Sequence, residues 1–237
     1  MSSKGTVLIT GGAKRIGKAI SVFFAVKGYN IALHYNNSEF DAAKIKKEIE
    51  KLGQKCILFK GNFNSPEELE KLIQNVKNSF PDLSILINNA SVFEEGLFLN
   101  TTIEQLDKHL NINFKAPFFL SQSFARLCEH GQIINILDTN ITRNHSKYFA
   151  YNLSKKALYN LTKMAAYELG PKIRVNAIAP GVILMPAGKD SVDIESTPLK
   201  KQGELKNILE ALSYLVENNY VTGECLFVDG GEHLISY

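Results

Sequence analysis

Apolar runs of strand length alternate with segments of helical periodicity along the whole chain. The predicted strands cover residues 6–10, 31–35, 55–59, 83–87, 133–137, 174–178 and 225–228. The predicted helices cover residues 15–27, 41–52, 66–79, 102–110, 114–128, 149–168 and 204–217, and the helix that ends at 128 starts either at 114 or nearer Asn111. The strands are continuously apolar rather than alternating, which is typical of a parallel sheet covered by helices on both faces. We therefore expect one doubly wound α/β domain over residues 1–237.

One segment, residues 181–203, has no clear periodicity. Long connections without secondary structure of their own are often functional, and many cover an active site. We therefore expect a flexible substrate loop here.

A glycine-rich turn joins the first predicted strand to the first predicted helix. Residues 10–17 read Thr-Gly-Gly-Ala-Lys-Arg-Ile-Gly. Small residues at this place let the backbone approach a pyrophosphate, which the helix N-terminus then stabilises. A tight bend alone would also select glycine, but the placement between strand and helix favours a dinucleotide. The residues expected to bind it are Gly11, Lys14, Arg15, Ile16 and Gly17.

The end of the second predicted strand distinguishes the two nicotinamide cofactors. An acidic residue that binds the adenosine ribose usually stands there, about 20 residues after the glycine turn. This chain has no acid at that place, where it carries Tyr35, Asn36, Asn37 and Ser38. Together with the basic residues of the turn, these donors suit a 2′-phosphate, so we expect NADPH rather than NADH. Alternatively, the two asparagines are turn formers only.

Tyr151 and Lys155 lie four residues apart in the predicted helix 149–168 and therefore share one helical face. The ammonium group beside the phenol would favour the ionised phenol, whose unperturbed pKa is about 10. The pair could then exchange a proton near neutral pH. Asp138 directly follows the strand 133–137 and stands 13 residues before Tyr151. The alternatives are an ordinary amphipathic helix face for the pair and a helix or loop cap for Asp138.

Composition excludes several classes of partner. The net charge of +3, from 27 basic and 24 acidic residues, is too small to indicate nucleic acid or a membrane surface. No stretch approaches the roughly 18 to 20 apolar residues of a membrane span, and the first strand begins too early for a signal peptide. Cys56, Cys128 and Cys225 are widely spaced in apolar surroundings, as expected of buried thiols in the cytoplasm. No His/Cys cluster has metal-ligand spacing, so no metal is expected.

Together these motifs resemble those of the short-chain dehydrogenase/reductase family over essentially the whole chain. Residues 10–17 are similar to its Thr-Gly-x-x-x-Gly-x-Gly turn, and Tyr151 with Lys155 to its Tyr-x-x-x-Lys pair. The other matches are Asn88-Asn89-Ala90 for its Asn-Asn-Ala-Gly, Asn113 for the asparagine that links the catalytic lysine to a water relay, Pro180-Gly181 for the turn over the nicotinamide, and residues 222–223 and 229–231 for the last strand. The resemblance implies a Rossmann fold with seven parallel strands in the order 3-2-1-4-5-6-7.

Departures from the family pattern resemble one of its branches, the pteridine reductases. Arg15 replaces the middle glycine of the turn, Ser91 the glycine after Asn-Ala, and Asp138 the usual serine. Phe93 falls where an aromatic ring would hold a pterin against the nicotinamide, and Tyr148 matches another pocket tyrosine. The implied substrate-binding residues are Arg15, Ser91, Phe93, Asp138, Tyr148 and Tyr151. The further implied cofactor-binding residues are Asn62, Phe63, Asn89, Ala90, Ser91, Tyr151, Lys155, Pro180 and Gly181.

The branch implies an NADPH-dependent reductase of a pterin or folate C=N bond. Tyr151 would donate the proton, while Lys155 would lower the pKa of Tyr151 and bind the nicotinamide ribose. Asp138 would orient Tyr151 or pass a proton through water to the pterin. Asn113 would hold a water beside Lys155. Arg15 would contact the pterin carbonyl and the pyrophosphate together.

Two other functions stay open at this point. A carbonyl reductase of the same family would act on a 3-oxoacyl thioester or another ketone, and Asp138 argues against it because that chemistry usually relies on a serine hydroxyl. A catalytically inactive NADP-binding interaction protein is the other, and the intact Tyr151, Lys155 and Asn113 argue against it.

The oligomeric state is only weakly indicated. The helices 114–128 and 149–168 carry apolar residues on more than one face, among them Phe118, Phe119, Tyr159 and Tyr167. Such surface suggests an interface, and the resemblance implies a homotetramer or homodimer built on these helices. Burial on both sides within one subunit would produce the same pattern.

Overall fold

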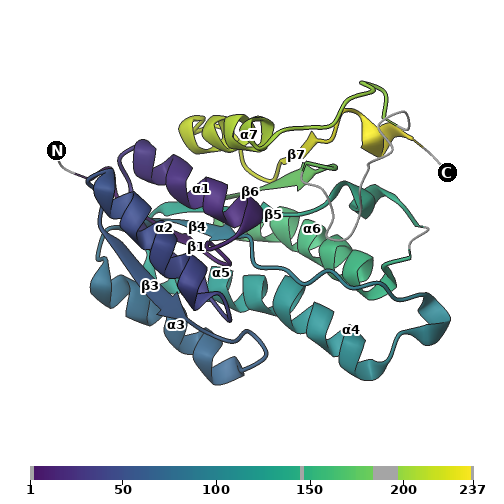
Figure 1. The fold of residues 1–237 in the computed structure, drawn as a ribbon, viewed down its shortest axis with the longest axis horizontal. Helices are drawn as coiled ribbons and strands as arrows, with labels where there is room; N and C mark the ends of the chain where they lie inside the picture. Colours follow the sequence, from purple (N-terminus) through teal and green to yellow (C-terminus); the bar gives the residue numbers. More distant parts are fainter. Residues whose placement is uncertain (1–2, 145–146, 184–196, 236–237) are drawn as a thin grey trace.

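Seven parallel strands form one sheet in the computed structural model, which describes residues 3–144, 147–183 and 197–235 (Figure 1). The strands are β1 (Thr6–Ile9), β2 (Asn30–Tyr35), β3 (Cys56–Lys60), β4 (Leu83–Asn88), β5 (Gly131–Ile136), β6 (Ile173–Pro180) and β7 (Cys225–Val228). Their order is β3-β2-β1-β4-β5-β6-β7, which confirms the order expected from the family resemblance. Every strand expected from the apolar runs is present, and no end has moved by more than two residues.

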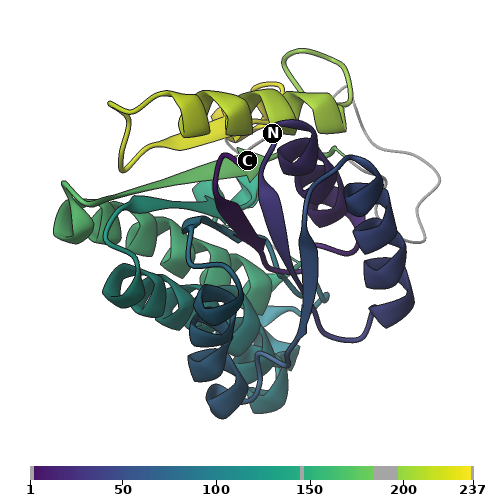
Figure 2. The ribbon, with the colours of Figure 1, turned by 90° about the vertical axis from the view of Figure 1, so that its left-hand side faces the viewer.

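Helices cover both faces of the sheet (Figure 2). One face carries α1 (Arg15–Val26), α2 (Glu39–Lys51) and α7 (Leu205–Glu217), and the other carries α3 (Pro66–Ser79), α4 (Ile103–Leu110), α5 (Ala116–Leu127) and α6 (Phe149–Leu169). Successive residues of β1 belong to different cores: Val7 and Ile9 pack toward α1, while Leu8 packs toward α3 and α5. This double burial is the reason the strands are continuously apolar in sequence.

The expected start at residue 114 is wrong, and the alternative start nearer Asn111 is confirmed. α4 runs into α5 without interruption through a π-helical turn, Asn111–Lys115, in which the Ala116 N–H donates to the Asn111 carbonyl. Pro117 has no N–H to donate and its ring would collide with the residue 113 carbonyl in a regular α-helix. The wider π turn accommodates the proline at this point, and it turns the Asn113 side chain into the buried interior.

The carboxyl ends of the central strands meet at one edge of the sheet, where the strand order reverses between β1 and β4. The glycine-rich turn follows β1, Asn89 follows β4, Asp138 follows the end of β5, and Pro180 ends β6. The fold therefore gathers the candidate chemistry of four separate chain segments at one place.

The three cysteines are buried free thiols, as expected. Burial raises the pKa of Cys56 and of Cys225 to about 12, so neither thiol ionises near neutral pH. Within the described ranges, no helix has both the length and the apolar character required to cross a membrane.

Candidate active site

The glycine-rich turn packs directly against the loop that follows β4. Gly11 has φ +61°, and a Cβ on Gly17 would lie 2.2 Å from the Gly11 carbonyl oxygen and 2.6 Å from Asn89 Nδ2. Asn89 Nδ2 donates to the carbonyls of Thr10 and Gly11 at 2.8 and 3.1 Å. The turn thus needs glycine at these positions, because the space that a Cβ would fill is occupied by backbone and by Asn89.

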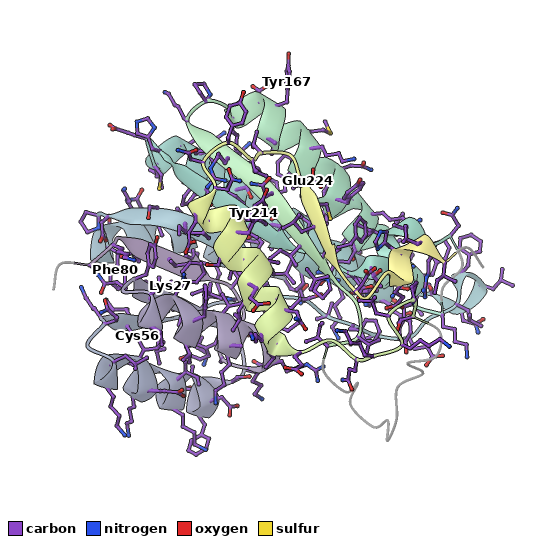
Figure 3. The ribbon with its side chains drawn as sticks, turned by 90° about the horizontal axis from the view of Figure 1, so that it is seen from above. Lys27, Cys56, Phe80, Tyr167, Tyr214 and Glu224 are labelled. Atoms are coloured by element: carbon purple, nitrogen blue, oxygen red, sulfur yellow. The ribbon has the colours of Figure 1, made fainter. Side chains whose placement is uncertain are left out.

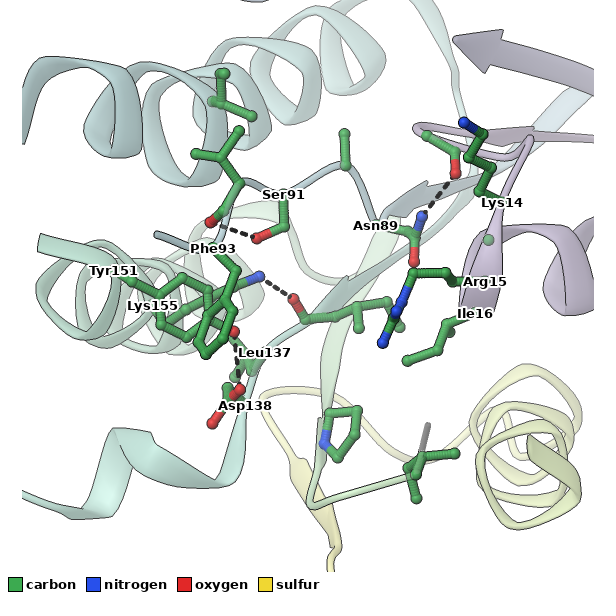
Figure 4. Close-up of a pocket in the computed structure, with 18 of the residues that line it drawn as sticks. Lys14, Arg15, Ile16, Asn89, Ser91, Phe93, Leu137, Asp138, Tyr151 and Lys155 are labelled. Atoms are coloured by element: carbon green, nitrogen blue, oxygen red, sulfur yellow. Dashed lines mark hydrogen bonds between the residues drawn. The ribbon is translucent and has the colours of Figure 1, made fainter. Parts of the chain in front are cut away.

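A cavity of about 910 Å³ extends from this turn to the end of β6. Most of the residues expected from the sequence line it: Gly11, Lys14, Arg15, Ile16, Gly17, Tyr35, Asn36, Asn37, Ser38, Phe63, Asn89, Ala90, Ser91, Phe93, Asp138, Tyr148, Tyr151, Lys155, Pro180 and Gly181. Figure 4 shows the catalytic end of this cavity, with Phe93, Tyr151 and Asp138 on one side and Arg15 on the other. Its size fits the range of cofactor and ligand pockets.

Two expected site residues do not line the cavity. Asn62 is exposed on the turn before α3, where its Oδ1 accepts the Asn64 N–H at 3.1 Å and its own N–H bonds the Glu68 carboxylate. The expectation that Asn62 binds the adenine is therefore not supported by its position. Asn113 lies behind the cavity wall rather than in it.

The Asn113 side chain is fully hydrogen-bonded within the protein. Its Oδ1 accepts from Ser91 Oγ and the Val92 N–H, and its Nδ2 donates to the Val92 carbonyl and Ser154 Oγ, all at 2.9 to 3.1 Å. An asparagine amide offers two donors and two acceptor sites, so none is left for a water beside Lys155. The side chain instead ties the loop after β4 to α6.

His34 and Phe63 form the floor under the glycine turn. The two rings stack at 4.2 Å, and His34 Nδ1 accepts the Gly11 N–H while Nε2 donates to the Gly61 carbonyl. Burial lowers the pKa of His34 to about 4, so the ring is neutral and fixed in one tautomer. Its role is to hold the turn in place.

Asp138 has a different partner on each carboxylate oxygen. Oδ2 accepts the Tyr151 hydroxyl at 2.8 Å (Figure 4), while Oδ1 accepts the backbone N–H and Nδ2 of Asn140, both at 2.8 Å. Asp138 is therefore both the cap of the short 3-10 helix η3 (Thr139–Thr142) and the partner of Tyr151. Burial raises the pKa of the Asp138 carboxyl despite these hydrogen bonds.

The expectation that Lys155 favours the ionised Tyr151 is wrong for this arrangement. Burial and the adjacent Asp138 carboxylate raise the pKa of Tyr151 well above its usual value. Lys155 Nζ donates instead to the Ile136 carbonyl at 2.7 Å and lies 5.8 Å from the centre of the Tyr151 ring. Burial lowers the pKa of Lys155 to about 8, against the opposing pull of Asp138.

Two aromatic rings wall the mouth of the cavity beside Tyr151. Phe93 stacks on Tyr148 at 4.2 Å and meets the edge of Tyr151 at 4.7 Å. Phe93 is 51% exposed, so a flat ring entering the cavity would find an accessible aromatic surface. Glu95 and Glu232, which no sequence pattern singled out, also line this end.

The expected substrate loop at 181–203 lies mostly outside the described residues, which resume at 197. Its first residue, Gly181, lines the cavity and donates its N–H to the Val228 carbonyl at 3.0 Å. Among the residues that the structure does describe, no group of three or more His, Cys, Asp or Glu side chains could hold a metal ion.

Known proteins resemble the chain over nearly all of its length. A family model described as enoyl-(acyl carrier protein) reductase matches residues 11–233. The chain is 31% identical to an uncharacterized oxidoreductase, YhxC, of Bacillus subtilis, over 95% of this chain and 84% of that protein. It is 28% identical to the 3-oxoacyl-(acyl-carrier-protein) reductase FabG of Staphylococcus epidermidis, over 97% and 99%. The solved structure of FolM alternative dihydrofolate reductase 1 from Brucella canis, complexed with NADP, superposes with a TM-score of 0.94 at 31% identity, over 100% of this chain and 97% of that one.

Proposed function

The chain belongs to the short-chain dehydrogenase/reductase family, and from that premise we propose that it reduces a pterin or folate C=N bond with NADPH. The observation that carries the proposal is the hydrogen bond from Tyr151 to Asp138, in a place where carbonyl reductases usually have a serine hydroxyl. The likeness to a Brucella protein called an alternative dihydrofolate reductase supports the same assignment.

The cavity fits the cofactor. Gly11 and Gly17 line the cavity at the N-terminus of α1, where the N–H groups of the first helical turn favour an anion such as a pyrophosphate. Asn36, Asn37 and Ser38 line the cavity at the end of β2, where their polar groups could donate to a 2′-phosphate, and nearby Lys14 is paired with Asp41 at 3.1 Å. When bound, NADPH supplies a hydride, and the chain's own residues must orient the acceptor and provide the proton.

Tyr151 is placed to donate that proton. Its raised pKa keeps the hydroxyl protonated until a substrate nitrogen accepts the proton. Lys155, whose ammonium is charged below about pH 8, would bind the nicotinamide ribose. Reprotonation of Tyr151 needs a proton from solvent, which Asp138, whose own pKa is raised by burial, would first accept and then pass to Tyr151 through their shared hydrogen bond.

The aromatic rings of Phe93 and Tyr148 account for binding of a flat, fused ring. Both residues line the cavity, where Phe93 is 51% exposed and stacks on Tyr148 at 4.2 Å. Offset stacking on such a ring contributes about 0.5–1.5 kcal/mol beyond the apolar area that it covers. A linear 3-oxoacyl chain would gain nothing comparable from a stacked pair.

A carbonyl reductase is the second candidate, because the FabG protein of Staphylococcus epidermidis is 28% identical to this chain. Steady-state assays separate the two. We expect NADPH oxidation with a dihydropterin, a quinonoid dihydropterin or dihydrofolate, and none with an acetoacetyl thioester. Asp138→Ser should lower pterin turnover, and Asp138→Asn serves as the matched variant that keeps the shape of the side chain.

Two results would contradict the proposal. Thioester turnover that survives Asp138→Ser would assign the carbonyl reductase. Tight binding of NADPH without turnover of any substrate would favour the inactive interaction protein. A thermal-shift screen of NADPH with a panel of pterins would then rank the substrates of an active enzyme.

A further inference from the structure

A second polar cluster joins the loop after β5 to the C-terminal segment. Arg143 pairs with Glu232 at 3.2 Å and also donates to the Glu232 main-chain carbonyl at 3.4 Å. Both side chains are largely buried, with exposed fractions of 22% and 12%. Burial of this kind makes the pair far less screened by solvent than a surface ion pair.

A parallel set of contacts holds the same two segments together. Thr139 Oγ1 donates to Asp229 Oδ2 at 2.5 Å, and His233 donates to the same carboxylate through its backbone N–H at 2.8 Å and through Nδ1 at 2.9 Å. The 3-10 helix η4 (Glu232–Leu234) is therefore attached to the η3 segment twice, through Asp229 and through the Arg143–Glu232 pair. Residues 229–234 thus hold the loop that carries Asp138 in place.

The Arg143–Glu232 pair connects to Asp138 through one residue. Arg143 donates to Asn140 Oδ1 at 3.3 Å, and Asn140 in turn donates twice to Asp138 Oδ1. These contacts fix Oδ1 and leave Oδ2 directed at Tyr151. An unbroken set of polar contacts thus runs from Glu232 to the candidate proton donor.

The surroundings of Glu232 at the cavity wall favour its ion pair with Arg143. Its carboxylate lines the cavity, and its Oε2 has no hydrogen-bond partner among the described residues and lies against Gly181, where a Cβ would be only 2.9 Å away. Burial and the charges of Asp138 and Asp229 raise the pKa of Glu232, while Arg143 lowers it. The Arg143 guanidinium therefore stabilises the charged form of the buried Glu232 carboxyl, and Glu232 in turn holds the guanidinium in place.

We propose that Arg143 and Glu232 are positioning residues that hold Asp138 in the orientation in which it accepts the Tyr151 hydroxyl. Glu232 keeps the Arg143 guanidinium on Asn140 Oδ1. Without either member of the pair this contact loosens, so Asn140 no longer fixes Asp138 Oδ1 and the carboxylate is less well held against Tyr151. The proposal rests on the proposed function only in that Asp138 and Tyr151 act together.

The first test reads the Asp138–Tyr151 contact without any substrate. Glu232→Gln keeps the size of the side chain and removes its charge. Burial raises the pKa of Tyr151 most, and the Asp138 carboxylate raises it further, so we expect the pKa to be lower in the variant than in the wild type. An ultraviolet pH titration measures this pKa. The titration curve of the corresponding protein with Tyr151→Phe is subtracted, which leaves the signal of Tyr151 alone out of the nine tyrosines. Other titratable groups also face these residues: Lys155 faces Asp138, His109 faces Tyr151, and Asp229 faces Glu232. All three are retained in the variant.

The second test is a double-mutant cycle in the holoenzyme. Glu232→Gln and Arg143→Gln should each lower kcat roughly tenfold, the size of a typical coupling between contacting side chains. In an Asp138→Asn background neither should lower kcat further, because the group through which they act has gone. Glu210→Gln, on the exposed Lys206–Glu210 pair of α7, is the matched control and should leave both readouts unchanged.

Two outcomes would overturn the proposal. An unchanged Tyr151 titration in folded Glu232→Gln would show that the pair does not set the contact. Effects on kcat that multiply with those of Asp138→Asn would show an independent structural role. If Glu232→Gln does not fold, Arg143→Gln carries the same two readouts. Absence of pterin turnover in the wild type would contradict the proposed function alone, because the titration does not depend on it.

Discussion

Tyr151 is held by a carboxylate rather than by an ammonium, and this reverses the usual picture of how a tyrosine of this kind is activated. Its hydroxyl faces Asp138 Oδ2 at 2.8 Å, whereas Lys155 Nζ is turned to a backbone carbonyl. Burial and the negatively charged Asp138 raise the pKa of Tyr151, so the phenol keeps its proton until a substrate approaches. A donor must carry its proton at the start of the reaction, so the arrangement suits reduction better than oxidation.

Removing the Tyr151 hydroxyl tests the proton-donor role directly. Tyr151→Phe should lower kcat by about 100-fold or more, the contribution of a positioned acid or base, while NADPH binding stays near normal. Stopped-flow and steady-state rates of NADPH oxidation measure this. The exposed Tyr167→Phe is the control with the same chemical change, and near-normal turnover in Tyr151→Phe would refute the assignment.

Lys155 should impose a basic limit on activity. Its pKa of about 8 means that the ammonium loses its charge as the pH rises through that value. The charged contact with the cofactor ribose would then be lost, so kcat/KM should decline above about pH 8. A profile that stays flat up to about pH 10, the ordinary range of lysine, would contradict this. Lys163→Gln, on the exposed side of α6, should leave the profile unchanged.

At the scale of single residues, the sequence predicted which side chains lie in the site but not whether their neighbours raise or lower the pKa of Tyr151. The spacing of Tyr151 and Lys155 correctly places both side chains in one cavity. Which group sits closest to the phenol depends on the rotamers and on the end of β5, neither of which periodicity records. The same limit applies to Asn113: three of its four hydrogen bonds go to the loop after β4, and the fourth goes to Ser154 on α6, 41 residues away in sequence.

The helical and strand elements follow the apolar pattern closely because each strand is buried on both sides. The one misplaced boundary, between α4 and α5, arises because Asn111 and Asn113 resemble a break while Pro117 is accommodated by a π turn. A proline near a short polar run predicts a kink or a stop equally well. Only tertiary packing decides between them.

The glycine turn offers a matched pair of substitutions. Gly17→Ala places a methyl group 2.2 Å from the Gly11 carbonyl oxygen, so the turn must move and NADPH affinity should fall at least about tenfold. Gly53→Ala meets nothing within 4 Å and carries only the strain of φ +85°. It should cost about 1 kcal/mol of stability and leave affinity intact.

Fluorescence titration with NADPH and thermal unfolding measure the two effects separately. Equal affinities in Gly17→Ala and Gly53→Ala would show that the turn does not approach the cofactor. At this chain length, 1 kcal/mol corresponds to roughly 2–4 °C in Tm.

Across the whole molecule, the outer faces of α5 and α6 expose large apolar side chains. Phe118, Phe119, Met164 and Tyr167 are 37%, 46%, 70% and 91% exposed, and Tyr167 projects outward from the molecule (Figure 3). We propose that these faces form the interfaces of a homotetramer or homodimer. Clusters of exposed apolar residues of this kind are typical of contact surfaces.

A charge placed on this surface should dissociate the assembly. Phe119→Lys would bury an unpaired ammonium at the interface, so light scattering after size-exclusion chromatography should give a smaller mass than for the wild type. Tyr220→Lys, at a residue that is 97% exposed in the loop before β7, should not change the mass. A wild-type protein that elutes as a monomer would refute the proposed assembly.

Arg15 combines a strained backbone conformation, which lowers thermal stability, with a side chain proposed to bind the substrate. It is one of two described residues other than glycine with positive φ, at +51°, and it occupies a turn position at which a glycine would be unstrained. Laboratory evolution for survival at high temperature, with no screen for turnover, should therefore drift toward Arg15→Gly. The products should melt later and require more substrate for the same rate, and a plot of Tm against KM for the selected clones would reveal that exchange.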